Sequence, residues 1–555
     1  MKLSKRTVTS FICIACCCVL LCACAPQEPQ DQATPTPAPS GTAAVNDQNT
    51  QGVNQAPNSS ACATQKPKEE DFICGLPDDP GSNPSSRPTQ AVTPMPTVSP
   101  SPTVQSSKEP SLPTAIRAGD AYRIFLWSNT EENGVVYRDD RELWRWEDFQ
   151  NKYGATVTWI SNSYLQWQTE VFEAALAGEP VADIYCFGTT ALMIDMLFYN
   201  ASNKSVSPKD IYQDLSKYGE YTNFDDAKYW DQSAAEVGYF GGAQLAVVPY
   251  RNGWNDVKGN QVTFFNKKLL EEAGYSAQQM YSLYQSGQWT FDKFREIALA
   301  CTNADSGVFG SAIGESAISM LSLISANGGR ILTPDKDGIQ RYTVNSEQSV
   351  YAINFLLDMC NKDKSIYLEN TIKQREGDLF RNGKIALMLT HAGTVQENQG
   401  PKGERIYQTE GLEYGIVLPP KGPNAQDHIS DRNDFSAYAV FKGHENIAGV
   451  VQCLYYYRTA MYPVDSQAQA TELANEAYAY FTSPEDIQTL QDAVKKTRVS
   501  SYMPYWYGGS NTVNLSSNVA GYLPIWLEGF GNVQQDTDRA VNDTNFFIDR
   551  MLDRL

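Results

Sequence analysis

The larger part of this sequence, residues 119–555, predicts an α/β fold made of two lobes. Its first elements follow in the order strand, helix, strand, which is typical of a parallel sheet covered by helices. It is 437 residues long, more than one hydrophobic core usually organises. Its composition also sets it apart, because all 10 Trp and all 31 Tyr come after residue 121, whereas 17 of the 29 Pro lie within residues 25–118.

The spacing of apolar residues predicts the individual elements. Residues 122–127 are apolar except for Arg123 and have the length of a strand. Residues 155–160 alternate apolar side chains with threonine, as a half-buried strand does. Between them, apolar residues recur at helical spacing from 143 to 153, and Gly154 follows as the expected C-cap. Further along, Thr290 is the expected N-cap of another helix.

The first 23 residues have the organisation of a secretion signal. Basic residues at positions 2, 5 and 6 precede an apolar run that is too short to span a bilayer comfortably. The segment Leu21-Cys22-Ala23-Cys24 resembles the lipobox of bacterial lipoproteins, which implies cleavage before Cys24 and a diacylglycerol on that cysteine. An ordinary cysteine-rich signal peptide, or a cut before Cys22, is the alternative. We therefore expect a protein that is lipid-anchored to the outer face of the bacterial cell membrane.

Residues 24–118 are predicted to be the lipidated cysteine followed by a disordered tether. The tether is rich in Pro, Ser and Thr and contains Phe72 as its one aromatic residue, so it has too little apolar surface to offset the entropy of folding. Prolines favour extended backbone, which lengthens its reach. Cys62 and Cys74 leave open whether they pair or stay reduced.

Several function classes are disfavoured by composition and motifs. A net charge of −20 argues against a nucleic-acid partner, because phosphate neutralisation requires clustered Lys and Arg. The chain has three His and no zinc-type spacing, phosphate loop or nucleophile elbow, so we expect no metal, no cofactor and no catalytic residue. The segment from Asp335 to Gly338 predicts a hairpin turn rather than a calcium loop.

Five segments, taken in order, resemble family 1 extracellular solute-binding proteins, the carbohydrate-binding subunits of ABC importers. Each is similar to one element of the family's pattern, and together they extend over about 160 residues of this chain. They are FFNKKLLEEAG at 264–274, WTFDKF at 289–294, the pair GVFG at 307–310 and ANGG at 326–329, FRNGKIALM at 380–388, and YGIVLPP at 414–420.

The resemblance implies a type II periplasmic-binding-protein fold, in which two α/β lobes are joined by hinge crossings and hold a ligand in the cleft between them. The first lobe is expected at about 119–255 and 425–465, and the second at about 262–420 and 470–555. It further implies a monomer without enzymatic activity, which binds a carbohydrate by cleft closure and delivers it to ABC permease subunits.

The candidate ligand contacts are aromatic residues beside polar groups in segments that this fold would bring to the cleft. Aromatic rings cover the C–H face of a sugar, while amides and carboxylates pair with its hydroxyls. The candidates are Trp127, Asn129, Tyr250, Trp254, Asp434, Tyr505 and Trp506. Asp434 lies where the family has a glycine-rich turn that this chain lacks. His391, a lone histidine after the FRNGKIALM element, is expected to be structural.

Two other functions stay open at this point. One is a binding protein for a peptide or another non-sugar solute, whose site would usually carry charged groups for the peptide termini. The other is a surface-anchored polysaccharide hydrolase or adhesin, because sequence alone does not show whether two carboxylates face each other across a substrate.

Overall fold

A computed structural model describes most of the region after residue 112. Gaps of one to three residues interrupt the third and fourth of its segments. The described segments are 113–127, 140–162, 174–187, 208–248, 253–314, 316–368, 375–397, 403–432, 437–459, 466–498 and 522–551. The predicted signal segment, Cys24, the tether and its two cysteines lie outside them.

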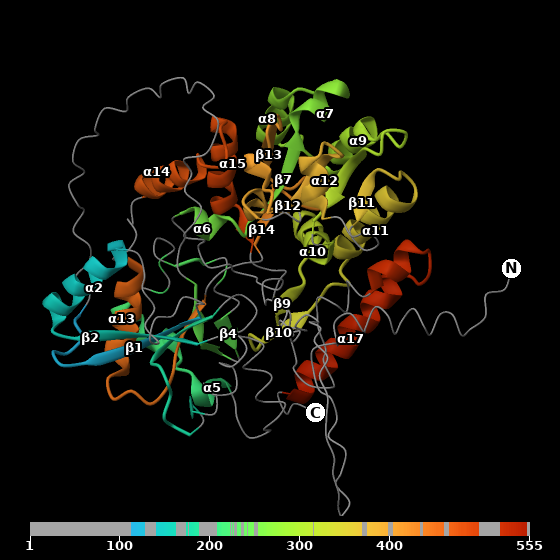
Figure 1. The fold of residues 1–555 in the computed structure, drawn as a ribbon. Helices are drawn as coiled ribbons and strands as arrows, with labels where there is room; N and C mark the ends of the chain where they lie inside the picture. The colour runs from blue at the N-terminus through green and yellow to red at the C-terminus, as the bar shows by residue number, and fades with distance from the viewer. Residues whose placement is uncertain are drawn as a thin grey trace, which may run out of the picture. The chain divides into compact units, whose positions relative to one another are not determined.

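Among the described residues, the first sheet has five strands in the order β2-β1-β3-β15-β6. Its strands β1 and β2 are labelled in Figure 1. Strand β1 is parallel to β2 and β3, and β15 runs antiparallel to both of its neighbours, β3 and β6. The strands are β1 (Ala121–Trp127), β2 (Thr156–Asn162), β3 (Ile184–Phe187), β6 (Ala246–Val247) and β15 (Ala437–Val440).

The predicted strand–helix–strand unit is confirmed at the start of this sheet. Helix α2 (Asp140–Tyr153) connects β1 to β2 and buries Trp146 and Phe149. The helix ends at Gly154, whose φ of 66° lies in the left-handed region that favours glycine. The ring of Trp146 then meets Trp159 of β2 at 5.4 Å between centroids, so the helix is held against the sheet by aromatic contacts.

The second sheet has five strands in the order β11-β8-β12-β7-β13. Strand β12 is parallel to β8 and antiparallel to β7, and β7 is antiparallel to β13. The strands are β7 (Gln261–Asn266), β8 (Phe309–Ile313), β11 (Ile366–Leu368), β12 (Ile385–His391) and β13 (Tyr414–Val417). All six residues of β7 are buried, as expected of a central strand covered on both faces.

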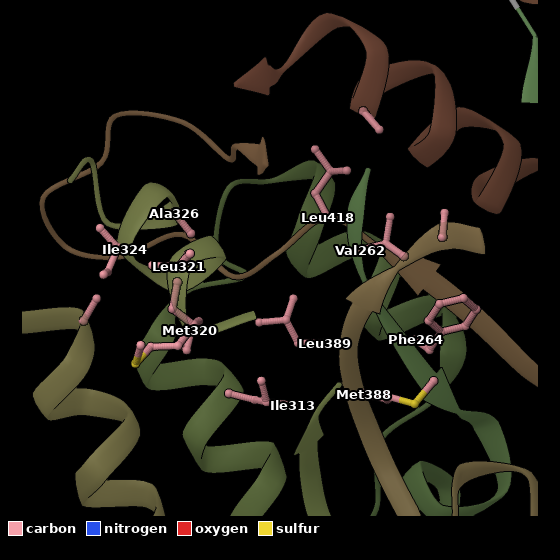
Figure 2. Packing of buried hydrophobic residues seen from close by; sticks show 14 of the residues in the cluster. Val262, Phe264, Ile313, Met320, Leu321, Ile324, Ala326, Met388, Leu389 and Leu418 are labelled. Atoms are coloured by element: carbon pink, nitrogen blue, oxygen red, sulfur yellow. The ribbon is translucent and has the colours of Figure 1, made fainter. Parts of the chain in front are cut away.

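Helices on both faces of this sheet close its core. Figure 2 shows Leu389 of β12 and Ile313 of β8 near Met320 of helix α10 (Ser316–Ala326), whereas Met388 lies near Phe264. Successive residues of β12 thus serve opposite faces of the sheet, as strand geometry requires. Helix α9 (Phe291–Cys301) begins at its predicted cap, where the Thr290 hydroxyl accepts a hydrogen bond from Lys293 N at 3.3 Å.

The remaining elements complete the two layers and the connections between them. The further helices are α5 (Pro208–Ile211), α6 (Trp254–Val257), α7 (Lys267–Glu272), α8 (Ala277–Gln285), α11 (Glu347–Asn361), α12 (Glu376–Arg381), α13 (Ile447–Thr459), α14 (Ser466–Ala477), α15 (Pro484–Lys495) and α17 (Val533–Met551), with 3-10 turns η2 (Leu215–Tyr221), η5 (Ala392–Val395) and η6 (Ile406–Gln408). Three two-stranded pairs are β4 (Tyr239–Phe240) with β5 (Ala243–Gln244), β9 (Leu332–Pro334) with β10 (Gln340–Tyr342), and β14 (Ser430–Asp431) with β16 (Thr497–Arg498).

Candidate functional site

In the first sheet, the register places the ends of several strands at one edge. Trp127 at the end of β1 is paired with Asn162 at the end of β2, and Phe187 at the end of β3 is opposite Ala437 at the start of β15. In α/β folds, ligands bind outside the carboxyl ends of the parallel strands. This edge is therefore the first half of the candidate site.

Most of the predicted ligand contacts adjoin that edge in sequence but lie outside the described residues. Trp127 is the last residue of β1, and the structure describes its backbone but not its side chain. Asn129, Tyr250 and Asp434 follow or precede described strand ends by two or three residues. Tyr505 and Trp506 also lie outside the described residues. Ligand contact by these six residues stays a prediction.

Trp254, at the start of α6, is the predicted contact whose side chain the structure describes. Its indole Nε1 donates to Gln396 Oε1 at 2.8 Å, and its backbone N donates to Glu476 Oε2 at 2.6 Å. The ring packs on Tyr480 and Phe481, with centroids 4.9 and 5.8 Å away. Only 5% of Trp254 is exposed, so in this conformation a ligand can reach no more than an edge of the ring.

The loop that contacts Trp254 follows β12, at the matching edge of the second sheet. There His391, the last residue of β12, is opposite Gln261 at the start of β7. His391 Nε2 lies 2.7 Å from Glu397 Oε1. Burial acts to raise the pKa of Glu397, but His391, with Arg375 and Lys258, outweighs it and holds that pKa below its usual range. This loop thus presents an ordered polar pair beside the connection between the two sheets.

Among the described elements, two chain segments lead from a strand of one sheet to a strand of the other, and a buried amide joins them. Asn260 precedes β7 on the first segment, and Ser430 lies on the segment that returns from β13 to β15. Asn260 Nδ2 lies within hydrogen-bond distance of Ser430 Oγ at 2.9 Å and of Thr497 Oγ1 at 3.0 Å. Ser430 Oγ in turn donates to Gln261 O at 2.9 Å. Hydrogen bonds therefore connect these two segments, called the crossings below, to each other and to β16 at one point.

Charged groups are buried beside this point. The guanidinium of Arg432 is 3.5 Å from Asp231 Oδ2, and the two side chains are 3% and 11% exposed. Asp431 Oδ2 accepts a hydrogen bond from Ser325 Oγ of α10 at 3.0 Å. Burying charges is costly unless they are paired and hydrogen-bonded, so these contacts fix how the returning segment passes between the sheets.

The described residues give no sign of a metal centre or a membrane span. Within these segments, no three His, Cys, Asp or Glu residues are grouped so that they could hold a metal ion. In the same part of the chain, no helix is long and apolar enough to cross a bilayer. The described residues form two sheet edges that carry polar and aromatic groups. Two chain segments, hydrogen-bonded to each other through Asn260, connect the two sheets.

Comparison with protein families gives a match to the bacterial extracellular solute-binding proteins over residues 140–486, more than half of the chain. The chain belongs to this family. Its members are binding proteins rather than enzymes, and their extracellular character places this solute-binding protein outside the cytoplasm. The family assigned from the five sequence motifs is thereby confirmed.

Solved structures with the same fold support the two-lobe architecture of this solute-binding protein. UspC of M. tuberculosis is 14% identical with a TM-score of 0.51, and the match covers 77% of this chain and 100% of that one. The cyclic alpha-maltosyl-1,6-maltose binding protein of Arthrobacter globiformis is 12% identical with a TM-score of 0.52, covering 78% of this chain and 99% of that one. The predicted type II periplasmic-binding-protein fold is confirmed. Comparison with curated proteins gave no match.

Sequence reasoning missed the residues that fasten the crossings of this solute-binding protein. Asn260, Ser430 and Thr497 are small polar residues in unremarkable surroundings, and no spacing rule distinguishes them from surface residues. Asp231 was likewise not predicted. No motif marks Arg432 either, and its burial is visible only in the fold.

Proposed function

We propose that this protein binds an oligosaccharide or a similarly hydroxyl-rich solute by closing its two lobes, and delivers it to the permease of an ABC importer. Membership of the solute-binding family carries the proposal. The choice of a sugar is supported by the neighbour from Arthrobacter globiformis, which binds cyclic alpha-maltosyl-1,6-maltose, and by the aromatic residues that adjoin the strand ends.

Recognition would divide between the two sheet edges. On the first, Trp127, Asn129, Tyr250 and Asp434 supply ring faces and hydroxyl partners, because each adjoins a strand end at that edge in sequence. On the second, Trp254 lies beside the loop after β12, and its ring must be partly uncovered for a sugar to stack on it. Tyr505 and Trp506 complete the proposed set.

A double substitution tests these contacts. We expect Trp254→Ala together with Trp506→Ala to abolish sugar binding in protein whose circular dichroism is unchanged. The matched control is Trp526→Ala, since Trp526 is another buried tryptophan, its Nε1 donates to Asp536 Oδ2 at 2.9 Å, and it is not one of the proposed contacts. Unchanged affinity in the double variant would refute the assignment of both residues.

The lipid anchor and the tether are part of the same proposal. Acylation of Cys24 would hold the chain at the membrane, and the tether would let the folded part reach both its solute and the permease. Mass spectrometry of the native N-terminus is expected to find an acylated Cys24, and an unmodified terminus would reject the anchor. The folded part is proposed to act as a monomer, which sedimentation analysis checks.

A thermal-shift screen separates this function from its rivals. The panel contains linear and cyclic maltooligosaccharides, other plant and bacterial oligosaccharides, and short peptides. A rise in melting temperature with a sugar is expected. A rise with peptides alone would favour the non-sugar alternative, and release of labelled fragments from polysaccharide would favour a hydrolase.

A further inference from the structure

The hairpin β9–β10 has a shape that its own side chains fix. Asp335 follows β9, and its Oδ1 accepts hydrogen bonds from Asp337 N at 2.9 Å and Ile339 N at 3.0 Å. Its Oδ2 accepts from Arg341 Nε at 2.9 Å. The predicted hairpin turn is thus confirmed, and both carboxylate oxygens are occupied by the loop itself. Gly338 near the tip has a φ of 72°, a conformation that L-residues rarely adopt.

The C-terminal helix holds the base of this hairpin. Asn545 of α17 accepts a hydrogen bond from Tyr342 N at 2.9 Å and donates one to Tyr342 O at 3.0 Å, as a neighbouring strand would. Arg341 forms an ion pair with Asp549 at 2.7 Å. Tyr342 is fully buried, so the hairpin is rigidly joined to the elements around the second sheet.

The tip of the hairpin contacts Tyr239 of β4, a strand that precedes β6 of the first sheet. A Cβ added to Gly338 would lie 2.8 Å from Tyr239 Cδ1 and closer still to Cε1, so the ring rests directly on the glycine backbone. Figure 1 shows β4, which contains Tyr239, beside β9 and β10.

Tyr239 is itself firmly placed. It pairs with Gln244 across the β4–β5 turn, and Gln244 N donates to Asp214 Oδ1 at 3.1 Å. Leu245 N donates to Gly238 O at 2.7 Å, immediately before β6 of the first sheet. The contact between Gly338 and Tyr239 therefore joins two rigidly held hairpins, one from each lobe.

We propose that Gly338 and Tyr239 are positioning residues that set how closely the two lobes approach each other when the protein closes. This rests on the proposed function, because closure matters to a protein that holds its solute between lobes. In this arrangement a methyl group at position 338 would overlap the Tyr239 ring, so either the ring or one of the hairpins must move. In the proposal the hairpins move, and the lobes are held apart. A ligand that requires the closed form binds more weakly in proportion to the loss of that form.

The test measures the distance between the lobes without any ligand, so it does not depend on identifying the solute. Spin labels at Lys217→Cys on η2 and Lys362→Cys after α11 report that distance by pulsed electron resonance in the full chain, since these side chains are 74% and 69% exposed. The variant is Gly338→Ala. The matched control is Gly307→Ala, because Gly307 has a φ of 65° and no atom within 4 Å of an added Cβ.

We expect Gly338→Ala to reduce the short-distance population by roughly tenfold, and Gly307→Ala to leave it unchanged. In a Tyr239→Ala background, Gly338→Ala should produce no further shift, because the clashing ring is gone. The proposal is overturned if the alanine at 338 behaves like the one at 307, or if its effect is the same with and without the Tyr239 ring. Absence of sugar binding would refute the proposed function, but the distance between the lobes would still test the role of Gly338 and Tyr239, because it is measured without a ligand.

Discussion

Asn260→Ala should weaken the fold at the point where the two crossings are fastened. The Asn260 amide has two N–H donors, and its acceptors are Ser430 Oγ at 2.9 Å, Thr497 Oγ1 at 3.0 Å and Ala493 O at 3.3 Å. Asn260 is fully buried, so water cannot replace these bonds. At about 1 kcal/mol for each lost donor and a further increment for acceptors left unsatisfied, we expect a loss of about 2–4 kcal/mol in the free energy of unfolding.

Urea denaturation at 25 °C, followed by far-ultraviolet circular dichroism, measures that loss. Asn382→Ala is the matched control, because the amide of Asn382 donates to Asp378 O at 2.8 Å in an exposed setting. Its substitution should cost less than about 1 kcal/mol, since water replaces the lost bond. A cost for Asn260→Ala no larger than that of the control would refute the role assigned to Asn260.

Three further predictions concern single side chains. Burial raises the pKa of Asp486 to about 6, so its ionisation opposes folding increasingly as the pH rises from its usual pKa to about 6, and fully above that. Asp486→Asn should therefore stabilise the protein at pH 7.5 by up to about 3 kcal/mol, with the gain vanishing near pH 4, and urea denaturation showing a loss at pH 7.5 would contradict this. Trp254→Phe should cost about 1–2 kcal/mol of unfolding free energy and Trp254→Ala about 3–5, and equal costs would exclude a packing role for the ring. The pKa of Glu397 is lowered, so its pairing stabilises the protein above the usual carboxyl pKa and is lost as the pH falls through the lowered pKa. Glu397→Gln should cost about 1–2 kcal/mol at pH 7 and progressively less as the pH falls below the usual carboxyl range, and a pH-independent cost would argue against the ionic pair.

Local features of this chain were predictable because neighbouring residues determine them. The strand–helix–strand unit from 121 to 162, the Thr290 cap and the hairpin at Asp335 each depend on side chains within a few residues of one another. Hydrophobic spacing and capping chemistry operate at that range, so one sequence is enough to read them.

The fastening of the crossings was not predictable, because its members are distant in the chain. Asn260 is 170 residues from Ser430 and 237 from Thr497, and nothing local marks these three residues as partners. The pairing of Arg432 with Asp231 was not predictable for the same reason, because these two residues are also distant in the chain.

Aromatic composition was ambiguous for a related reason. A tryptophan near a crossing has the same sequence signature whether its ring faces a ligand or the core. For Trp254 the deciding contacts come from Gln396 and from the Tyr480–Phe481 pair, which lie far along the chain. Burial of that ring therefore emerged only from the assembled fold.

Isothermal titration of the purified protein with an oligosaccharide that raises its melting temperature shows whether the protein binds a sugar. We expect saturable binding of one solute per chain, with a negative heat-capacity change because apolar surface is buried when the lobes close. Titrations of folded protein that give no heat at several temperatures, with every sugar of the panel, would contradict it.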